Sequence, residues 1–366
     1  MALSLICVQC LAEGCLRQVA AAFWLPFVLR NTTSLRNGNE QVCNMINDLN
    51  DDPIDAVITW VDGNDPAHRA KRNQYMAQSL EALHENASNP HRWEQSDEIY
   101  FCLHSIHNHA PWIRTIWIVV DEAAPDLARL SQPLRDKIRV VFHRDIFEGH
   151  GDVLPTFNSL AIESMMWRIN GLAERFLYFN DDVFLTAPLL PRDMFDGAAP
   201  VLRRGAWVDY AALVVDHKAR ADPAFFNHYM LINAARLCGV QAERLFACAH
   251  VVHPMRRSVM AELFDRHFDE FMQNIGHRFR HLSQFSPLGL HTQACIDANA
   301  YQLGPQDDHL HITSGHGADQ PSGDTRALLT AEGLAEVKVL CVNDLPQLEA
   351  LVPDARLLIR DAVGMA

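Results

Sequence analysis

The sequence lacks any excess of positive charge. Its 366 residues include 31 Lys and Arg against 45 Asp and Glu, which gives a net charge of −14. An acidic chain of this kind excludes non-specific binding to nucleic acid, because that binding depends on clustered cations. A phosphate-bearing ligand would therefore have to be held by a metal ion or by a few individual basic residues.

The chain also has no disulfide framework. Its nine cysteines are an odd number with irregular spacing, and the only close pair is Cys7 and Cys10. A single Cys-x-x-Cys without a second pair excludes a four-cysteine zinc site. Reduced thiols in a cytosolic enzyme are the simplest interpretation.

A long hydrophobic run is missing as well. The longest apolar stretch of the N-terminal region, residues 19–29, is too short to span a bilayer and contains Pro26. No Lys or Arg precedes the first apolar stretch, so it is a poor signal peptide. We expect residues 1–30 to form a helix that packs on the domain or touches a membrane surface, although a misassigned start codon would also explain it.

Four common catalytic signatures are absent: GxGxxG, Walker A, GxSxG and HExxH. Their absence disfavours dinucleotide oxidoreductases, P-loop NTPases, α/β-hydrolases and zincins.

The most informative stretch present is residues 176–185, an apolar run interrupted by Asn180, Asp181 and Asp182. Two adjacent carboxylates at the end of a buried strand repel each other unless a cation neutralises them. Hard oxygen ligands of this kind suit Mg²⁺ or Mn²⁺. The alternative is an Asn-Asp-Asp turn, since these residues also favour turns.

Apolar strands alternate with amphipathic helices through the first half of the chain. This order predicts an α/β fold with a mostly parallel sheet and helices on both faces. The second half is more helical, with amphipathic segments at 223–237 and 256–273. The strands expected in the first half are 54–61, 115–120, 138–142 and 175–180, and the helices are 67–83, 97–108 and 158–169.

Three of these strands end in acidic residues. Asp62 and Asp65 follow the first strand, Asp121 and Glu122 follow the second, and the Asp181–Asp182 pair follows the fourth. The ligands of open α/β sheets bind outside the carboxyl ends of the strands. The pattern therefore predicts a cation and phosphate site at this edge of the sheet.

Two windows of the second half combine histidine with arginine or a second histidine. They are residues 250–254, His-Val-Val-His-Pro, and residues 277–281, His-Arg-Phe-Arg-His. Imidazole and guanidinium groups suit proton transfer and anion binding. Taken alone, these side chains are better explained as structural histidines and as arginines paired with the abundant acids.

These windows together resemble the Stealth family of sugar-1-phosphate transferases, which includes bacterial capsule polymerases. The resemblance covers residues 53–345 in four blocks: 54–66, a long discontinuous block from 98 to 182, 250–280, and 341–344. His104, Val120 and Glu122-Ala123 depart from the family pattern. These departures bear on the contacts of that loop and on sugar specificity.

The resemblance implies an α/β domain similar to GT-A glycosyltransferases over residues 51–345, with 1–50 as an apolar segment and linker and 346–366 as a tail. It implies transfer of a hexose-1-phosphate, expected to be an N-acetylhexosamine-1-phosphate, from a UDP-sugar to a hydroxyl of a growing polysaccharide, with release of UMP. The expected setting is capsule or exopolysaccharide synthesis in the cytoplasm, with at most peripheral contact at the inner face of the membrane.

The resemblance also implies roles for individual residues. The catalytic residues are His253 as base, Arg280 as phosphoryl clamp and Asp62, while Asp181 and Asp182 hold Mg²⁺ or Mn²⁺. Substrate contacts are expected from a further set of eight residues: Gly63, Asp65, Asn158, Asn180, His250, Arg278, Asn343 and Asp344. Two alternatives remain, a metal-dependent GT-A glycosyltransferase that releases UDP, and a non-catalytic partner in glycan assembly.

Overall fold

The computed structural model describes residues 52–79, 83–85, 96–215, 222–240, 244–312 and 322–365. The expectations for residues 1–50, including the membrane contact, lie outside this part of the chain. The described residues from 53 onward form one compact unit.

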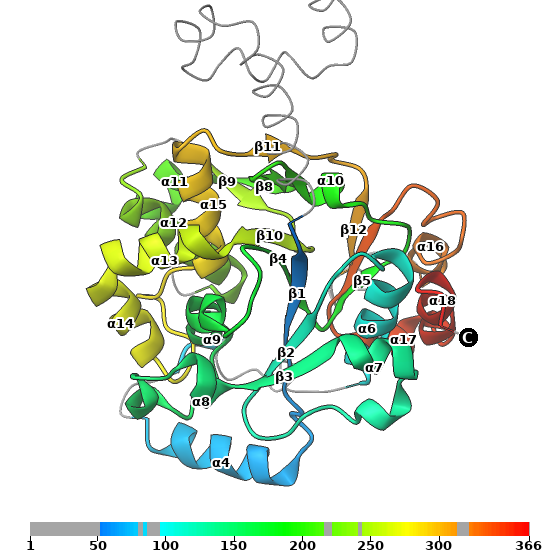
Figure 1. Cartoon of the computed structure of the whole chain (residues 1–366), viewed down its shortest axis with the longest axis horizontal. Helices are drawn as coiled ribbons and strands as arrows, with labels where there is room; N and C mark the ends of the chain where they lie inside the picture. Colours follow the sequence, from blue (N-terminus) through cyan, green and yellow to red (C-terminus); the bar gives the residue numbers. More distant parts are fainter. Residues whose placement is uncertain are drawn as a thin grey trace, which may run out of the picture. The chain divides into compact units, whose positions relative to one another are not determined.

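A five-stranded sheet in the order β10-β4-β1-β2-β3 forms the centre of this unit (Figure 1). The four strands from the first half of the chain are mutually parallel, and β10 is antiparallel to β4. The predicted α/β class with a mostly parallel sheet is therefore confirmed. The strands are β1 (Ile54–Thr59), β2 (Ile116–Val120), β3 (Ile138–Phe142), β4 (Arg175–Asn180) and β10 (His253–Arg256).

The strand order reverses beside β1. From β1 the chain moves outward through β2 and β3, and then returns to add β4 on the other side of β1. Such a reversal leaves a crevice at the carboxyl ends of the two strands that flank it, which is the usual ligand site of open α/β sheets. Here the two strand ends are Thr59 of β1 and Asn180 of β4.

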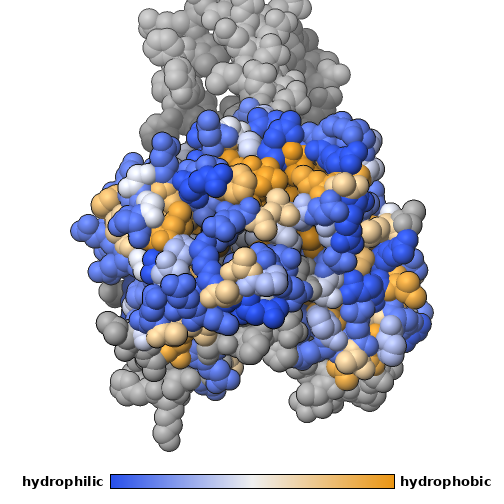
Figure 2. Space-filling model, turned by 90° about the horizontal axis from the view of Figure 1, so that it is seen from below, coloured by the Kyte–Doolittle hydropathy of each residue, from blue (hydrophilic) through white to orange (hydrophobic). Residues whose placement is uncertain are grey.

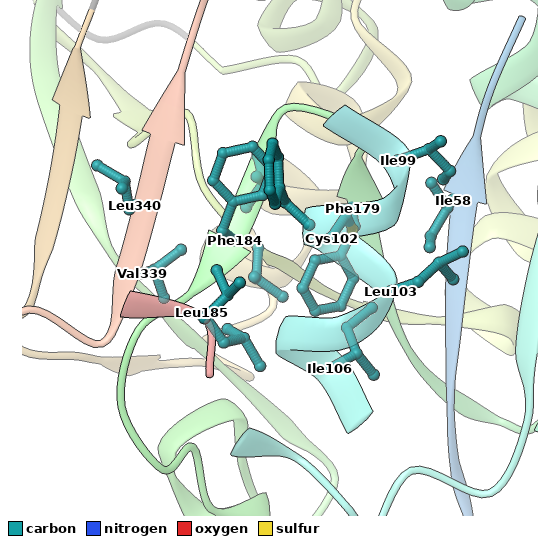
Figure 3. Packing of buried hydrophobic residues seen from close by; sticks show 14 of the residues in the cluster. Ile58, Ile99, Cys102, Leu103, Ile106, Phe179, Phe184, Leu185, Val339 and Leu340 are labelled. Atoms are coloured by element: carbon teal, nitrogen blue, oxygen red, sulfur yellow. The ribbon is translucent and has the colours of Figure 1, made fainter. Parts of the chain in front are cut away.

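Alternating residues of the buried strands pack into two separate cores, as the period of two in a strand requires. Ile58 and Phe179 join helix α6 (Glu98–His109) in one core (Figure 3). Their sequence neighbours Val57 and Tyr178 join α9 (Ser159–Met165) in the other. The helices thus cover both faces of the sheet, and neither face of β1 or β4 is left to solvent.

A smaller sheet continues from the acidic turn after β4. It has the order β12-β13-β5, with β5 at Val183–Leu185, β12 at His309–Ile312 and β13 at Val339–Val342. Phe184 of β5 and Leu340 of β13 pack in the same core as α6 (Figure 3).

The C-terminal residues are not a tail, so the predicted boundary at 345 is wrong. Helices α17 (Leu345–Leu351) and α18 (Ala355–Ala362) follow β13 directly. Ala355, Ile359 and Val363 are fully buried in the core that contains α6. The four-residue spacing of these apolar residues gives α18 one buried face, and that face packs against the core.

The second half is helical, as expected, but residues 256–273 form two helices rather than one. Helix α13 (Arg257–Arg266) ends and α14 (Phe268–Gly276) begins at His267, whose φ of −120° and ψ of 40° are not helical. The break allows Leu263 of α13 and Phe271 of α14 to enter the same core. The neighbouring helices are α12 (Phe226–Leu237) and α15 (Pro287–Asp297).

The remaining elements are short or peripheral. They are α4 (Pro66–Ala77), η3 (Leu127–Arg129), α7 (Gln132–Lys137), α8 (His143–Ile146), η4 (Gly151–Val153), η5 (Met166–Arg168), α10 (Pro191–Met194), β6 (Phe195–Asp196), β7 (Ala199–Leu202), β8 (Arg204–Asp209), α11 (Tyr210–Val215), η7 (Pro223–Phe225), β9 (Arg244–Cys248), β11 (Gln302–Leu303) and α16 (Ser322–Leu328).

Hydrophilic residues cover most of the face shown in Figure 2, with apolar side chains in smaller patches between them. Among the described residues, no helix combines the length and the apolar character that a membrane span requires. The five cysteines in this part of the chain, at 102, 238, 248, 295 and 341, are all free thiols.

Candidate active site

A cavity of about 970 Å³ lies at the carboxyl ends of β1 and β4, where the strand order reverses. Segments that are far apart in the sequence meet there: the ends of both strands, the start of α9, the loop before β10, the loop after α14 and the turn after β13. The predicted site residues that line it are Asn158, Asn180, Asp181, Asp182, His250, His253, Arg280, Asn343 and Asp344.

The carboxylate pair is held by main-chain pairing. Asp181 and Asp182 form the tight connection between β4 and β5, and both are half-buried. The Val342 amide donates to the Asp182 carbonyl at 3.0 Å, so the end of β13 holds the backbone of the second aspartate. The position of this pair is therefore set in part by the strands that flank it.

The region around the pair is strongly negative. Burial, together with the charges of Asp181 and Asp182, holds the pKa of the Cys102 and Cys341 thiols well above the usual value. Burial and then the Glu163 charge do the same for Tyr178, with the two aspartates adding to the effect. Half-buried oxygen donors in a negative field match the preference of Mg²⁺ and Mn²⁺, so the residues present fit such an ion.

Glu98 is an acidic residue of the cavity that sequence reasoning did not single out. It lies in the first turn of α6 and is buried, and its carboxylate accepts from the Ser96 amide at 2.7 Å. Burial, and then the Asp181 charge, raise its pKa to about 7. The sequence signal for Glu98 was an acidic residue at the start of an apolar helix. Acidic residues are common in the first turn of any helix, so this pattern does not indicate a functional site.

The loop that carries His250 approaches another strand closely. The Ala249 amide donates to the Arg203 carbonyl at 2.8 Å, and a Cβ on Gly205 would lie 2.8 Å from the Ala249 Cα atom. Only glycine leaves room for this approach. The loop then places the His250 ring 3.1 Å from the Asn180 amide, measured between Nε2 and Nδ2.

His253 is the first residue of β10 and pairs with Tyr178 of β4. Burial, and then the neighbouring His250 and His291, lower its pKa to about 3. The imidazole is therefore neutral at physiological pH in the ligand-free site, which is the form that can accept a proton. An anion bound beside it would raise this pKa again, because a nearby negative charge favours the protonated form.

Arg280 enters the cavity from the loop after α14. One of its terminal nitrogens donates to the Ser159 hydroxyl at 2.8 Å. Burial lowers its pKa, while the charges of Glu163 and Tyr178 act in the opposite direction. Glu163 is itself buried and lines the cavity, so it is a second residue that sequence reasoning did not assign a role.

A buried network of side-chain amides holds the Arg280 loop. The Asn158 amide donates to the His277 carbonyl at 2.8 Å and to the Gln284 side chain at 2.9 Å. Gln284 donates in turn to the Asn274 carbonyl at 2.7 Å. Asn158 is fully buried and its carbonyl accepts from the Leu160 amide. We therefore assign Asn158 to positioning the loop, because a substrate contact would have to replace these bonds.

Four predicted residues do not line the cavity. Asp62 accepts from the Asn64 amide at 2.9 Å, in a turn that also contains Gly63. Asp65 caps α4 by accepting from the Ala67 amide at 3.0 Å. Arg278 donates to the Pro155 carbonyl at 2.7 Å. In this structure Asp62, Asp65 and Arg278 have structural contacts, and their roles toward a substrate remain predictions.

The acidic residues after β2, Asp121 and Glu122, form ion pairs that the sequence pattern did not predict. Asp121 lines the cavity together with His68 and His143. Lys71 of α4 donates to Asp121 at 3.1 Å and to Glu122 at 3.0 Å. These two carboxylates are thus paired with a lysine of α4.

Two family models match the chain. Stealth protein conserved region 1 covers residues 52–80, and Stealth protein conserved region 2 covers residues 92–201. The chain belongs to the Stealth family. The windows at 250–280 and 341–344 lie outside these two matches, and the cavity nevertheless brings residues of both beside the second region.

Curated relatives carry phosphotransferase names. Two exopolysaccharide phosphotransferases of Streptomyces coelicolor are 36% identical over 237 residues and 34% identical over 304 residues. The alignments cover 64% and 81% of this chain, and 42% and 47% of the relatives. A capsular polysaccharide phosphotransferase of Actinobacillus pleuropneumoniae is 37% identical over 175 residues, 47% of this chain and 46% of the relative. The chain thus spans less than half the length of these relatives.

Solved glycosyltransferase structures also match, at low similarity. A galactosyltransferase, LgtC, solved with donor and acceptor sugar analogues, is 11% identical with a TM-score of 0.37, over 83% of this chain and 95% of that one. Mouse xyloside xylosyltransferase 1 is 12% identical with the same TM-score, over 79% of this chain and 96% of that one. Similarity at this level says nothing about the substrate.

Proposed function

We propose that this protein transfers a sugar-1-phosphate from a nucleotide sugar to a hydroxyl group of a glycan, and that it acts in capsule or exopolysaccharide synthesis. The observation that carries the proposal is the cavity at the β1–β4 crevice. It combines a carboxylate pair, a neutral, half-buried imidazole and a guanidinium group, which are the three kinds of group that transfer of a phosphoryl-linked sugar requires. The names of the relatives agree with this chemistry.

In the proposed reaction, His253 accepts the proton of the acceptor hydroxyl as the oxygen attacks the β-phosphorus of the donor. The bond from this phosphorus to the bridging oxygen breaks, and the nucleoside monophosphate leaves. The anomeric carbon keeps its bond to oxygen throughout. Arg280 suits the equatorial phosphoryl oxygens, because its planar group can donate to two of them at once.

Asp181 and Asp182 would hold Mg²⁺ or Mn²⁺. When bound, such an ion neutralises charge on the diphosphate. Asn343 and Asp344 lie on the same side of the cavity as the pair, since β13 is paired with β5. Asp344 has a left-handed backbone, with φ of 65°, a conformation that Asp tolerates better than most residues.

We propose a UDP-sugar as donor, with an N-acetylhexosamine as the sugar and UMP as the leaving group. The acceptor is the growing polysaccharide. We place the reaction in the cytoplasm because nucleotide sugars are made there, with any membrane contact limited to residues 1–30.

The test is to incubate the full chain with a panel of UDP-sugars, a glycan acceptor and Mg²⁺, and to identify the nucleotide released. Release of UMP together with a phosphodiester in the product supports the proposal. Release of UDP would instead identify a glycosyltransferase that attacks the anomeric carbon. If neither nucleotide forms with any donor, and an Asp182→Asn variant binds glycan as well as the wild type, the protein is a binding partner and not an enzyme.

A further inference from the structure

Beside the carboxylate pair lies a set of ligand atoms that differs in chemistry from a magnesium site. One carboxylate oxygen of Asp182, one ring nitrogen of His250 and the Cys341 sulfur all lie within 4.8 Å of one another. An oxygen, a nitrogen and a sulfur donor thus converge on one point at the edge of the cavity. Mg²⁺ would not bind the nitrogen and sulfur donors, because it is coordinated almost exclusively by oxygen.

The three residues come from three separate elements that are tied together. Cys341 of β13 pairs with Val183 of β5, and the Val342 amide donates to the Asp182 carbonyl at 3.0 Å. His250 is fixed on its side by Asn180, at 3.1 Å. Cys341 is fully buried. Strand pairing and these two hydrogen bonds therefore bring the buried thiol and the two more exposed donors together.

This donor set matches a borderline-soft divalent cation. Zinc is bound by cysteine sulfur, histidine nitrogen and aspartate oxygen, at lengths that separate tetrahedral ligands by about 3.3–3.8 Å. The observed separations of up to 4.8 Å would close to this range through side-chain movements of about 1 Å. Three protein ligands leave the fourth tetrahedral position open to water or to a phosphate oxygen.

We propose that Asp182, His250 and Cys341 form a zinc site, and that zinc bound there inhibits the transfer reaction. A zinc ion bound to the Cys341 thiolate would also bind the Asp182 carboxylate. Asp182 would then no longer be free to hold the Mg²⁺ or Mn²⁺ that the transfer reaction needs. Binding releases the thiol proton to solvent, and no redox step is involved. The inhibition rests on the proposed function, whereas the binding does not.

The binding is tested on the metal-free full chain with Co²⁺ as a spectroscopic substitute for zinc. Titration should give a thiolate-to-cobalt charge-transfer band in the near ultraviolet, and added Zn²⁺ should remove it. Cys341→Ser should abolish this band. Cys102→Ser is the matched control, because Cys102 is also a fully buried thiol whose pKa is raised by burial and then by the same two aspartates, and it should keep the band.

If Cys341→Ser fails to fold, His250→Ala provides the second variant, since it leaves the buried thiol in place. It should weaken Co²⁺ binding by more than the roughly 10–100-fold that the loss of an outer-shell partner costs. Absence of the band in the wild type, or its persistence in folded Cys341→Ser, would overturn the proposal.

The inhibition is measured separately, as the zinc concentration that halves the magnesium-supported rate of each variant. Cys341→Ser should raise this concentration by at least about 10-fold. Equal zinc sensitivity in the wild type and in Cys341→Ser would contradict the inhibitory role. A cobalt band in a protein that transfers no sugar phosphate would sink the proposed function and leave the zinc site standing, while an active protein without the band would do the reverse.

Discussion

The two sides of the cavity are built differently. On the acidic side, Asp181 and Asp182 are adjacent in the sequence and connect two strands that are each paired in a sheet, and the Val342 amide donates to the Asp182 carbonyl. On the basic side, Arg280 depends on an amide network whose partners are far apart in the sequence, since Asn158 and Gln284 are separated by 126 positions. Main-chain pairing tolerates many side chains, whereas an amide network fails when one member is lost.

This difference between the two sides predicts whether a substitution should affect activity or stability. A change in the acidic side should remove chemistry and leave the fold intact, because the strands remain paired. A change in the network of the basic side should cost stability first and turnover second. The predictions below test this contrast.

Replacement of Asp182 by Asn should have the largest effect on activity. Turnover should fall by about 10³-fold or more, as expected when the charge that holds a catalytic cation is removed. The melting temperature should change little. Asp196→Asn, at an exposed position, is the matched control and should be fully active. A fully active Asp182→Asn, or an enzyme that needs no metal, would rule out the assigned role.

Replacement of His253 by Ala should lower turnover by roughly 10²–10⁴-fold with little change in donor affinity, as expected for loss of a general base. His250→Ala is the comparison, because His250 is the nearest rival. Steady-state rates and donor calorimetry separate the two effects. If His253→Ala is normal and His250→Ala is not, the base is His250. If both variants are active, Glu98, with its pKa raised to about 7, becomes the better candidate.

Replacement of Asn158 by Ala should lower the free energy of unfolding by about 2–3 kcal/mol, since it removes a buried hydrogen bond to Gln284 and a part-buried one to the His277 carbonyl. Turnover at a temperature where the variant is folded should fall by about 10-fold, through displacement of Arg280. Denaturant unfolding and rate measurements give both numbers. Asn64→Ala, at an exposed position, is the control. Unchanged stability together with a large loss of donor affinity would mean that Asn158 contacts the substrate after all.

The smallest expected effect is on the pH dependence of stability. Burial, and then the Arg256 charge, lower the pKa of His291 to about 3. Because the folded pKa lies below the unfolded value of about 6.5, this histidine's contribution to stability is complete above that pH and falls as the pH drops toward 3. The slope is at most about 1.4 kcal/mol per pH unit. His291→Gln keeps an acceptor for the Arg256 amide, which donates to His291 at 3.0 Å, and should flatten the slope between pH 6 and 5.

Unfolding at several pH values measures this slope. His150→Gln, which alters a partly exposed histidine, should leave it unchanged. An identical slope in the wild type and in His291→Gln would show that the buried imidazole does not control acid stability.

The acidic side was predictable from the sequence, and the basic side only through resemblance. A buried strand that ends in two carboxylates is a local pattern, and Asp181 and Asp182 lie where it indicated. Asp65 shows the limit of such patterns, because an acidic strand end is also a helix cap, and its side chain caps α4.

The other features that the sequence did not predict all depend on tertiary contacts. Residues 256–273 have one helical periodicity, but the core is filled better by two helices that break at His267. Residues 346–366 follow the last recognisable block, but the apolar face of α18 is needed to close the core. Burial of Glu98, and the bonds that make Asn158 a positioning residue, depend on contacts that no local pattern encodes.

The central claim is that the two sides of the cavity act on one ligand, the donor diphosphate. The most direct measurement is a double-mutant cycle in donor binding, by calorimetry with Mg²⁺, for the wild type, Asp182→Asn, Arg280→Lys and the double variant. Arg280→Lys keeps the charge but loses the planar fork, so it should weaken binding on its own. If both residues serve the same diphosphate, the two effects should differ from additivity by about 0.5–3 kcal/mol. Additivity within about 0.5 kcal/mol, the behaviour of distant and independent sites, would contradict the account.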